Sequence, residues 1–249
     1  MEKSKYALIG LVISFTLLFS THSINAQSAY KKIIYNAYIN GDMNKWANVI
    51  YTIEQNGDVK TTDQKLELVS YYYGYIGYLL GIKNYEKAQL MIPKGEKLIL
   101  QVLASSPKNS TAYAFKGSFI GFRISMNKFK AMTLGSESAA NLKKGYEIDP
   151  SNVQVLIDKA NALYHTPKLF GGDKNEALKL FQKGLKLIEN SKNTTNNWVY
   201  LNVLTLTARA HESLNQNEQA LQLYEKTLRF EPDYKRVKNE LLPALKKKM

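Results

Sequence analysis

Apolar side chains recur at spacings of three and four residues along most of this chain, and this pattern predicts amphipathic helices. The window 201–232 shows the pattern most clearly. Leu204 and Ala208 fall on one face of a first helix, and Ala220 and Tyr224 fall on one face of a second. The polar letters NQN lie between the two faces. The window therefore predicts two antiparallel helices joined by a short turn.

The same window carries the residues that close helix packing requires. Small side chains at Ala208 and Ala220 let the two helices approach each other closely. Tyr224 fills the space beside them, and Pro232 ends the second helix. This combination resembles a tetratricopeptide repeat (TPR), a helix-turn-helix unit of about 34 residues. The resemblance is weaker in earlier units, where glycine replaces the usual alanine, as at Gly74.

Proline punctuates the chain at nearly regular intervals. Pro107 and Pro150 each follow a long amphipathic stretch and are 43 residues apart. Pro150 and Pro232 are 82 residues apart, which is close to two such intervals. The chain therefore repeats about every 41 to 43 residues, a longer period than that of a simple TPR. We expect the extra length in the turns between paired helices or in longer helices.

The helices expected from this pattern cover nearly the whole chain after residue 27. Their ranges are 28–40, 43–56, 63–82, 84–105, 109–127, 130–148, 152–165, 174–190, 196–214, 217–230 and 233–247. No segment has the pattern of a strand. Pro93 is expected to kink or split the fourth helix, with "MIPKGEK" starting a new one. The predicted fold class is all-α, a right-handed α-solenoid of about five TPR-like helix pairs with a C-terminal capping helix.

Residues 1–26 have the features of a secretory signal peptide. Lys3 and Lys5 provide a positive start, a mostly apolar run of 14 residues follows, and Ala26 supplies a cleavage position. A membrane-spanning helix needs about 18 or more apolar residues, so an uncleaved anchor is the less favoured alternative. We expect an exported protein, periplasmic or secreted, with a TPR-like domain at 27–249 and no integral membrane span after cleavage.

Composition narrows the chemistry. The chain contains no cysteine, which excludes disulfides, thiolate metal sites, a cysteine nucleophile and a lipid-modified N-terminal cysteine. Its net charge of +13 suits an acidic partner or an anionic membrane surface. The lysines are spread along the chain, however, with a dense run only at 246–248. This dispersal is typical of a solvated surface, so we expect no nucleic-acid partner.

Histidines give little support to catalysis. His22 lies in the expected signal peptide, His211 falls on a predicted inner helix face and is expected to be packed, and His165 lies at a helix end. No zinc-binding histidine pair, nucleophile elbow or close acidic dyad occurs in a suitable context. We therefore expect a protein that is not an enzyme, with no catalytic residue, no metal ligand and no cofactor.

The segment HTPKLFGGDKNEA at 165–177 interrupts the helical pattern. It accounts for five residues beyond the spacing of the last unit. Pro167 disfavours continuation of the helix before it, and Gly171 and Gly172 permit backbone angles that are closed to other residues. These features are typical of a structural connector. In the alternative interpretation, the glycine backbone lines a pocket for a small molecule or peptide at the start of the next helix.

The end of this segment also predicts the start of a helix. Asp173 and Glu176 are spaced as a capping box, in which each side chain bonds a backbone amide of the other. Phe170 is expected to fold back against Leu178 or another apolar residue of the following helix. Both expectations favour the connector.

A more specific likeness rests on the same segment. It resembles an insertion, P-x-x-F-G-G-D-x-x-x-A, of exported bacterial TPR-like proteins, including the periplasmic component associated with tripartite, solute-binding-protein-dependent transporters. The matching residues are Pro167, Phe170, Gly171, Gly172, Asp173 and Ala177. This likeness implies a transporter-accessory role, although other members of that group have none.

The aromatic stretch YYYGYIGYLLG at 71–81 has large side chains on nearly all sides of its expected helix. Such a helix is expected to lie between neighbours, in the core. The alternative is an aromatic wall for a peptide or sugar, since tyrosine combines an apolar ring with a polar tip.

The TPR resemblance implies that partners bind the concave surface formed by the first helix of each pair. Transferred position by position, it places there Asn161, Tyr164, Asn202, Thr205 and Arg209. Phe170, Gly171 and Gly172 complete the candidate binding residues. The favoured function is a non-enzymatic exported repeat protein that binds another protein or peptide in the cell envelope, as a scaffold or assembly factor. The alternative is a small-ligand-binding or transporter-accessory protein.

Overall fold

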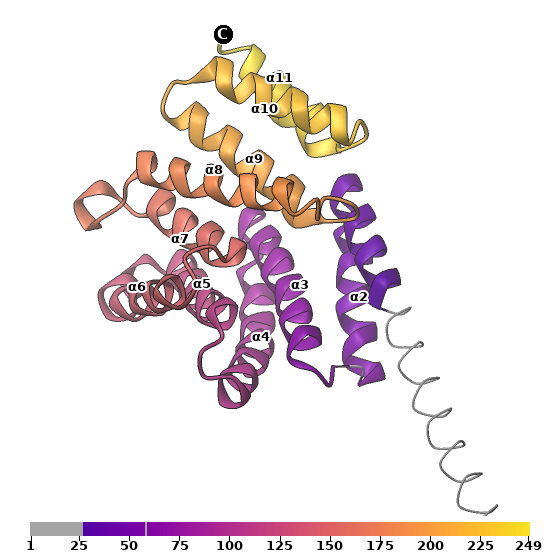
Figure 1. Cartoon of the computed structure of the whole chain (residues 1–249), viewed down its shortest axis with the longest axis vertical. Helices are drawn as coiled ribbons and strands as arrows, with labels where there is room; N and C mark the ends of the chain where they lie inside the picture. The colour runs from indigo at the N-terminus through magenta and orange to yellow at the C-terminus, as the bar shows by residue number, and fades with distance from the viewer. Residues whose placement is uncertain (1–26, 58) are drawn as a thin grey trace, which may run out of the picture.

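The computed structural model describes residues 27–57 and 59–249, and these residues form helices and turns without a strand. The expected signal peptide, 1–26, lies outside the described residues. A helix covers 27–40, and the α-helices after it are α2 (Met43–Asn56), α3 (Thr62–Gly81), α4 (Tyr85–Ser105), α5 (Ser110–Met126), α6 (Ala131–Ile148), α7 (Val153–His165), α8 (Lys174–Asn190), α9 (Trp198–Ser213), α10 (Asn217–Phe230) and α11 (Leu242–Lys246) (Figure 1). The short helices are η1 (Lys128–Lys130), η2 (Lys168–Phe170) and η3 (Val237–Leu241). The predicted all-α class is confirmed.

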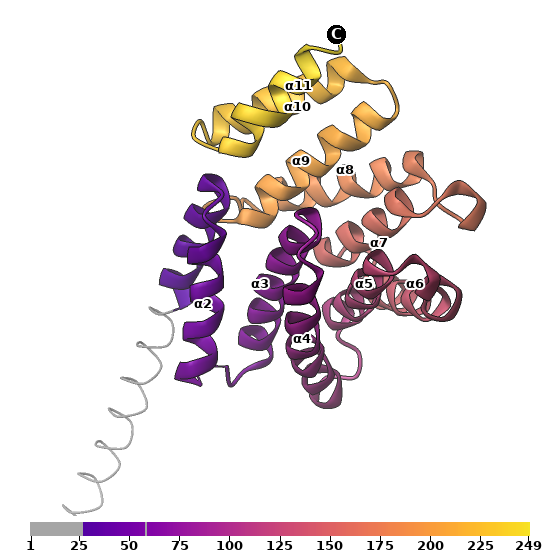
Figure 2. The same ribbon diagram turned by 180° about the vertical axis from the view of Figure 1, so that it is seen from behind.

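The helices pack as neighbours in sequence order. α3 packs on α4, α5 on α6, α7 on α8 and α9 on α10, while α4 with α5, α5 with α7 and α8 with α9 join consecutive pairs. Figures 1 and 2 show the pairs following one another in an arc from α2, past α6, to α10 and α11. No pair covers its apolar face alone, so each relies on its neighbours for burial. This is the TPR-like solenoid that the sequence predicts.

Small residues occupy the closest helix crossings. Ala208 and Ala220 are both fully buried, and so is Tyr224. At Gly74 of α3, an added Cβ atom would stand 2.6 Å from the indole ring of Trp46. Only glycine fits at that crossing, because the packed ring leaves no room for a side chain. The departure from alanine at this position therefore has a packing reason.

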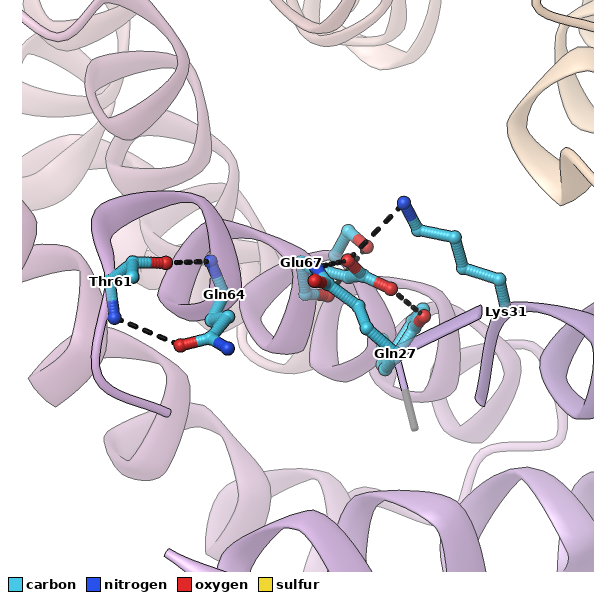
Figure 3. A network of polar contacts seen from close by, with 7 residues as sticks. Gln27, Lys31, Thr61, Gln64 and Glu67 are labelled. Atoms are coloured by element: carbon cyan, nitrogen blue, oxygen red, sulfur yellow. Dashed lines mark hydrogen bonds and ion pairs between the residues drawn. The ribbon is translucent and has the colours of Figure 1, made fainter. Parts of the chain in front are cut away.

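Most helices begin at a side chain that accepts hydrogen bonds from their first free amides. The capping residues include Asp42, Asn84, Asn109, Asn152, Asp173 and Asn197. α3 begins with a capping box, in which the Gln64 N–H donates to the Thr61 hydroxyl at 3.2 Å and the Thr61 N–H donates to the Gln64 side chain at 3.0 Å (Figure 3). These caps explain why the helix starts could be located closely from sequence.

The carboxylate of Glu67 links the helix at 27–40 to α3. Glu67 accepts hydrogen bonds from Gln27 and from the Tyr71 hydroxyl, and it pairs with Lys31 at 3.5 Å (Figure 3). The Glu67 side chain is only 13% exposed, so water screens these contacts less than it would at an open surface. Gln27, the first residue after the predicted cleavage position, is already part of this packing.

The two ends of the solenoid touch. The ring of Tyr38 lies 5.6 Å from that of Trp198 in α9 and 5.2 Å from that of Tyr234, between their centroids. Trp46 of α2 meets Trp198 edge to face at 5.1 Å. In Figures 1 and 2 the indigo N-terminal helix accordingly lies beside the ends of α9 and of the C-terminal helices. The first helix pair therefore packs against the last.

The expected new helix at Pro93 is wrong, because α4 runs unbroken from Tyr85 to Ser105. A proline inside a helix frees the carbonyl four residues before it. Here that residue is Gln89, which is exposed, so water can replace the lost hydrogen bond. Ile92 on one side of the proline and Gly95 on the other are buried against neighbouring helices. Tertiary packing thus holds the helix together across the proline.

The C-terminal helix contains a wider turn. Val237–Leu241 form the π-helical turn η3, and α11 follows directly. Pro243 has no N–H, and its ring crowds the carbonyl of Asn239, which the wider turn accommodates. Tyr234 and Leu245 are buried. The segment therefore covers α10 as the expected cap does.

Candidate functional site

The inner helix faces bring two of the predicted binding residues into contact with distant helices. The Asn161 side chain of α7 donates to the hydroxyl of Tyr73 in α3 at 3.1 Å. The hydroxyl of Tyr164, also in α7, donates to the backbone carbonyl of Arg209 in α9 at 3.4 Å. Both side chains are half-buried. The inner face thus joins α3, α7 and α9 through its own polar groups.

Two predicted residues of α9 face the protein rather than an open groove. The Asn202 side chain accepts from the Tyr38 hydroxyl at 3.2 Å. Thr205 is 2% exposed, and its hydroxyl donates to the Leu201 carbonyl at 2.8 Å. Tyr38 of the helix at 27–40 thus occupies the Asn202 side chain, and burial keeps Thr205 from the surface.

A rim remains, formed by the half-buried Tyr164 and Arg209 and by the exposed His165. The rings of Tyr164 and His165 meet edge to face at 4.9 Å. The protein displaces part of the water around the imidazole, which lowers the pKa of His165, and the charge of Arg209 lowers it further. The imidazole is therefore neutral at neutral pH. The rim combines an aromatic ring, a neutral imidazole and a guanidinium.

A buried carboxyl group lies beneath this inner face. Asp158 of α7 is 1% exposed, its Oδ1 accepts from the Gln154 amide at 3.0 Å, and its Oδ2 has no hydrogen-bond partner. Burial raises the pKa of Asp158 to about 7, although the hydrogen bond from Gln154 acts in the opposite direction. The sequence analysis missed this residue. The sequence does indicate that the residue is unusual, because this aspartate directly follows the apolar run at 155–157.

The insertion between α7 and α8 uses its own amides. Phe170 and Gly172 donate to the Pro167 carbonyl at 2.9 and 3.1 Å, and Gly171 donates to the Lys168 carbonyl at 3.1 Å. Gly171 has a positive φ of 90°, as expected for a glycine turn. An anion-binding loop needs free amides, and the backbone from 170 to 172 has none to offer.

Gly172 is required for a different reason from the one predicted. Its φ is not positive, but an added Cβ atom would stand 1.8 Å from the carbonyl oxygen of Thr166. The chain doubles back so closely here that no side chain fits. The insertion is therefore a compact connector whose glycines are fixed by local geometry.

Two details of the connector differ from expectation. Asp173 caps α8 by accepting from the N–H groups of Asn175 and Glu176 at 2.9 and 3.0 Å, but its own N–H donates to the Leu163 carbonyl instead of completing a capping box. Phe170 does not fold back on the next helix, because it is 74% exposed. Leu178, its expected contact, is already buried by the core.

His211 is packed, as predicted. Its ring is buried and bonds the side chains of Gln216 at 2.6 Å and Gln182 at 3.3 Å. Within residues 27–57 and 59–249, no group of three or more histidine, aspartate or glutamate side chains is placed to hold a metal ion.

The paired helices and buried small residues define an α-solenoid of the TPR type. Comparison of the sequence with models of known protein families and with curated proteins finds no match. The structure is similar to the haemophore HusA from Porphyromonas gingivalis, with a TM-score of 0.57 and 17% identity over 72% of this chain and 92% of that chain. It is also similar to a thermophilic TPR protein from Thermus thermophilus, with a TM-score of 0.55 and 12% identity over 90% of this chain and 98% of that chain. At these identities the likeness shows the fold alone.

Proposed function

We propose that this is a non-enzymatic, exported repeat protein of the cell envelope that binds another protein or peptide at the rim of Tyr164, His165 and Arg209. TPR-like solenoids bind their partners on the concave surface, through polar and aromatic side chains of the inner helices. In this chain, Asn161, Asn202 and Thr205 are bonded internally. At the rim, the Arg209 guanidinium and the exposed imidazole of His165 remain for a partner.

The half-buried guanidinium of Arg209 has no ion-pair partner within the described residues, and this observation carries the proposal. A guanidinium fits a carboxylate with two parallel hydrogen bonds. Arginine and tyrosine in half-buried positions are also the residue types that dominate binding energy at interfaces. An acidic segment of a partner therefore suits the rim.

A charge-reversal experiment tests this proposal. Wild type, Arg209→Glu and the matched control Arg229→Glu, at an exposed position of α10, are each used to capture proteins from an envelope extract of the source organism. We expect a partner that wild type and Arg229→Glu retain and Arg209→Glu loses, with affinity for the purified partner lowered about tenfold or more. The same proteins on all three baits, or none on any, would count against the rim.

A second candidate is a small-ligand-binding or transporter-accessory protein. It is favoured by the likeness to a haemophore together with the neutral imidazole of His165 beside Arg209. Imidazole is a common axial ligand of haem iron, and a guanidinium pairs with carboxylates such as propionates. The insertion at 165–177, which resembles that of transporter-associated proteins, begins at this histidine.

Haem titration tests the second candidate. We expect haemin to give a shifted Soret band with wild type and with the control variant His211→Gln, and a weaker or altered band with His165→Ala. Thermal unfolding against a panel of other metabolites covers the transporter-accessory role, because a ligand that binds only the folded state raises the melting temperature. If haemin gives no spectral change and the metabolites give no thermal shift, this candidate function is wrong.

A further inference from the structure

Two turns of this protein present bulky apolar side chains almost fully to solvent. The four most exposed large apolar residues of the described chain are Met132 at 89%, Leu169 at 87%, Phe129 at 85% and Phe170 at 74%. They lie in residues 128–132 and 168–172, which we call the two edge turns. Single exposed apolar residues are common on proteins. Four of them in two short turns are not explained by packing of the fold.

The two edge turns occupy equivalent places in consecutive helix pairs. η1 joins α5 to α6, and η2 joins α7 to α8. α5 and α7 pack against each other as the first helices of their pairs. First helices of neighbouring TPR-like units run in the same direction, so the turns at their C-terminal ends lie at the same edge of the stack. Figure 1 shows the turn between α7 and α8 projecting from the left edge, above α6.

Lysines surround the apolar side chains of both edge turns. Lys128 and Lys130 flank Phe129, and Lys168 precedes Leu169. The ranges 127–136 and 166–172 contain no acidic residue. None of these three lysines takes part in an ion pair within the described chain. Each turn therefore combines an apolar tip with uncompensated positive charge.

We propose that the two edge turns dock the protein on the surface of an anionic lipid bilayer. Phe129, Leu169 and Phe170 would enter the boundary between headgroups and acyl chains, while the lysines would meet the lipid phosphates. The attachment that we propose is peripheral, because these tips reach only that boundary. No helix within residues 27–57 and 59–249 is long and apolar enough to cross a membrane. The proposal does not depend on Arg209 or on a protein partner at the rim.

Shape and charge favour a bilayer over other occupants. The apolar side chains stand on protruding turns, whereas a peptide is usually held in a groove or pocket. A second copy would bring the same net charge of +13 and the same lysines to the contact, and like charges oppose such pairing. A bilayer with acidic headgroups offers complementary charge and an apolar layer at the depth that short tips reach.

Vesicle co-sedimentation tests the proposal. The protein is mixed with vesicles of phosphatidylcholine alone or of phosphatidylcholine with phosphatidylglycerol. We expect binding to the anionic vesicles that salt weakens. The variant Phe129→Ser/Leu169→Ser/Phe170→Ser is expected to bind more weakly by about tenfold or more, as is Lys128→Gln/Lys130→Gln/Lys168→Gln. All variants keep the same N-terminal segment, so its contribution cancels.

The matched control is Leu90→Ser/Leu100→Ser, at positions of α4 that are 64% and 57% exposed. It is expected to bind as wild type does. Circular dichroism melts check that every variant is folded. Equal binding to both vesicle types, or edge-turn variants that bind like the control, would overturn the proposal. Sedimentation velocity without lipid completes the test, since a dimer that only the edge-turn substitutions dissociate would assign the turns to a second copy instead.

Discussion

The hydroxyl of Tyr35 donates a 2.8 Å hydrogen bond to the carboxylate of Glu231, 196 residues further along the chain. Burial and the neighbouring carboxylate raise the pKa of Tyr35, so the hydroxyl stays protonated and remains a donor. In an open repeat array each unit touches only its neighbours. Here the first unit also touches the last, and this closure has consequences for how the protein unfolds.

Closure of the solenoid predicts cooperative unfolding that depends on Tyr38. Because its ring packs on Trp198 and Tyr234, Tyr38→Ala should lower the free energy of unfolding by about 2–3 kcal/mol. It should also let the N-terminal helix open separately. Hydrogen exchange measures both effects. In wild type the amides at 27–40 and in α9 are expected to open together, and in the variant those at 27–40 are expected to exchange first.

The control for closure is Tyr51→Ala. Tyr51 lies on α2 of the same pair but is 62% exposed, so its loss is expected to cost less than about 0.5 kcal/mol. If wild-type amides at 27–40 already exchange well before those of α9, the closure contributes nothing to cooperativity.

Gly74 and Gly77 of α3 form a matched pair for helix packing. Gly74→Ala should destabilise the protein by about 1–3 kcal/mol, because the new methyl group would collide with Trp46. Gly77→Ala meets nothing within 4 Å and should instead stabilise the helix by about 0.5–1 kcal/mol. Urea unfolding of the two variants measures the difference. Equal effects would show that the crossing at Gly74 is looser than its geometry indicates.

Asp158 predicts a stability that falls as the pH rises. Burial raises its pKa to about 7 in the folded protein, whereas an unfolded aspartate has a pKa of about 3.9. Between these values the folded state keeps a proton that the unfolded chain has released, so each step up in pH favours unfolding. The loss is on the order of 2–4 kcal/mol between about pH 4 and pH 7. Urea unfolding across this range measures it.

Asp158→Asn should flatten that pH profile and exceed wild type in stability above about pH 7, since the amide never ionises. Asp149→Asn serves as the control, because Asp149 changes the stability with pH in the opposite direction to Asp158. Hydrogen bonds from Ser151 lower the pKa of Asp149, so its stabilising contribution is lost as the pH falls. A wild-type slope that survives in Asp158→Asn would assign the effect to another group.

Gly172 of the connector tolerates no side chain. Gly172→Ala would place a methyl group against the Thr166 carbonyl, and the turn must shift at a cost of about 1–3 kcal/mol. Gly121→Ala is the control, because nothing lies within 4 Å of its added Cβ atom. Thermal unfolding compares the two. A Gly172→Ala variant as stable as wild type would mean that the connector is free to rearrange.

Much of the fold could be predicted because its causes are local. Apolar spacing locates the helices, and side chains such as Asp173 and Asn152 mark their starts by capping free amides. Ala208 and Ala220 identify the crossing of a pair. The failure at Pro93 has the opposite cause, since packing of α4 against its neighbours outweighs the local effect of one proline.

The candidate site was predicted less well, because helix periodicity tells which face is inner but not what covers it. Asn202 and Thr205 fall on the predicted inner face of α9, yet Tyr38 of the helix at 27–40 bonds Asn202, and Thr205 is buried. Asp158 was not singled out, although its burial is nearly complete. Phe170 was expected to pack and instead projects into solvent.

The sequence by itself determined the helices, their pairing and the small residues at their crossings, because each of these depends on residues within one repeat. Only the tertiary structure decided that Tyr35 reaches Glu231 and that Tyr38 contacts α9. These relationships depend on the rotation between successive pairs added over the whole stack. No single window of sequence contains that sum, since a small change at each interface moves the far end by many ångströms.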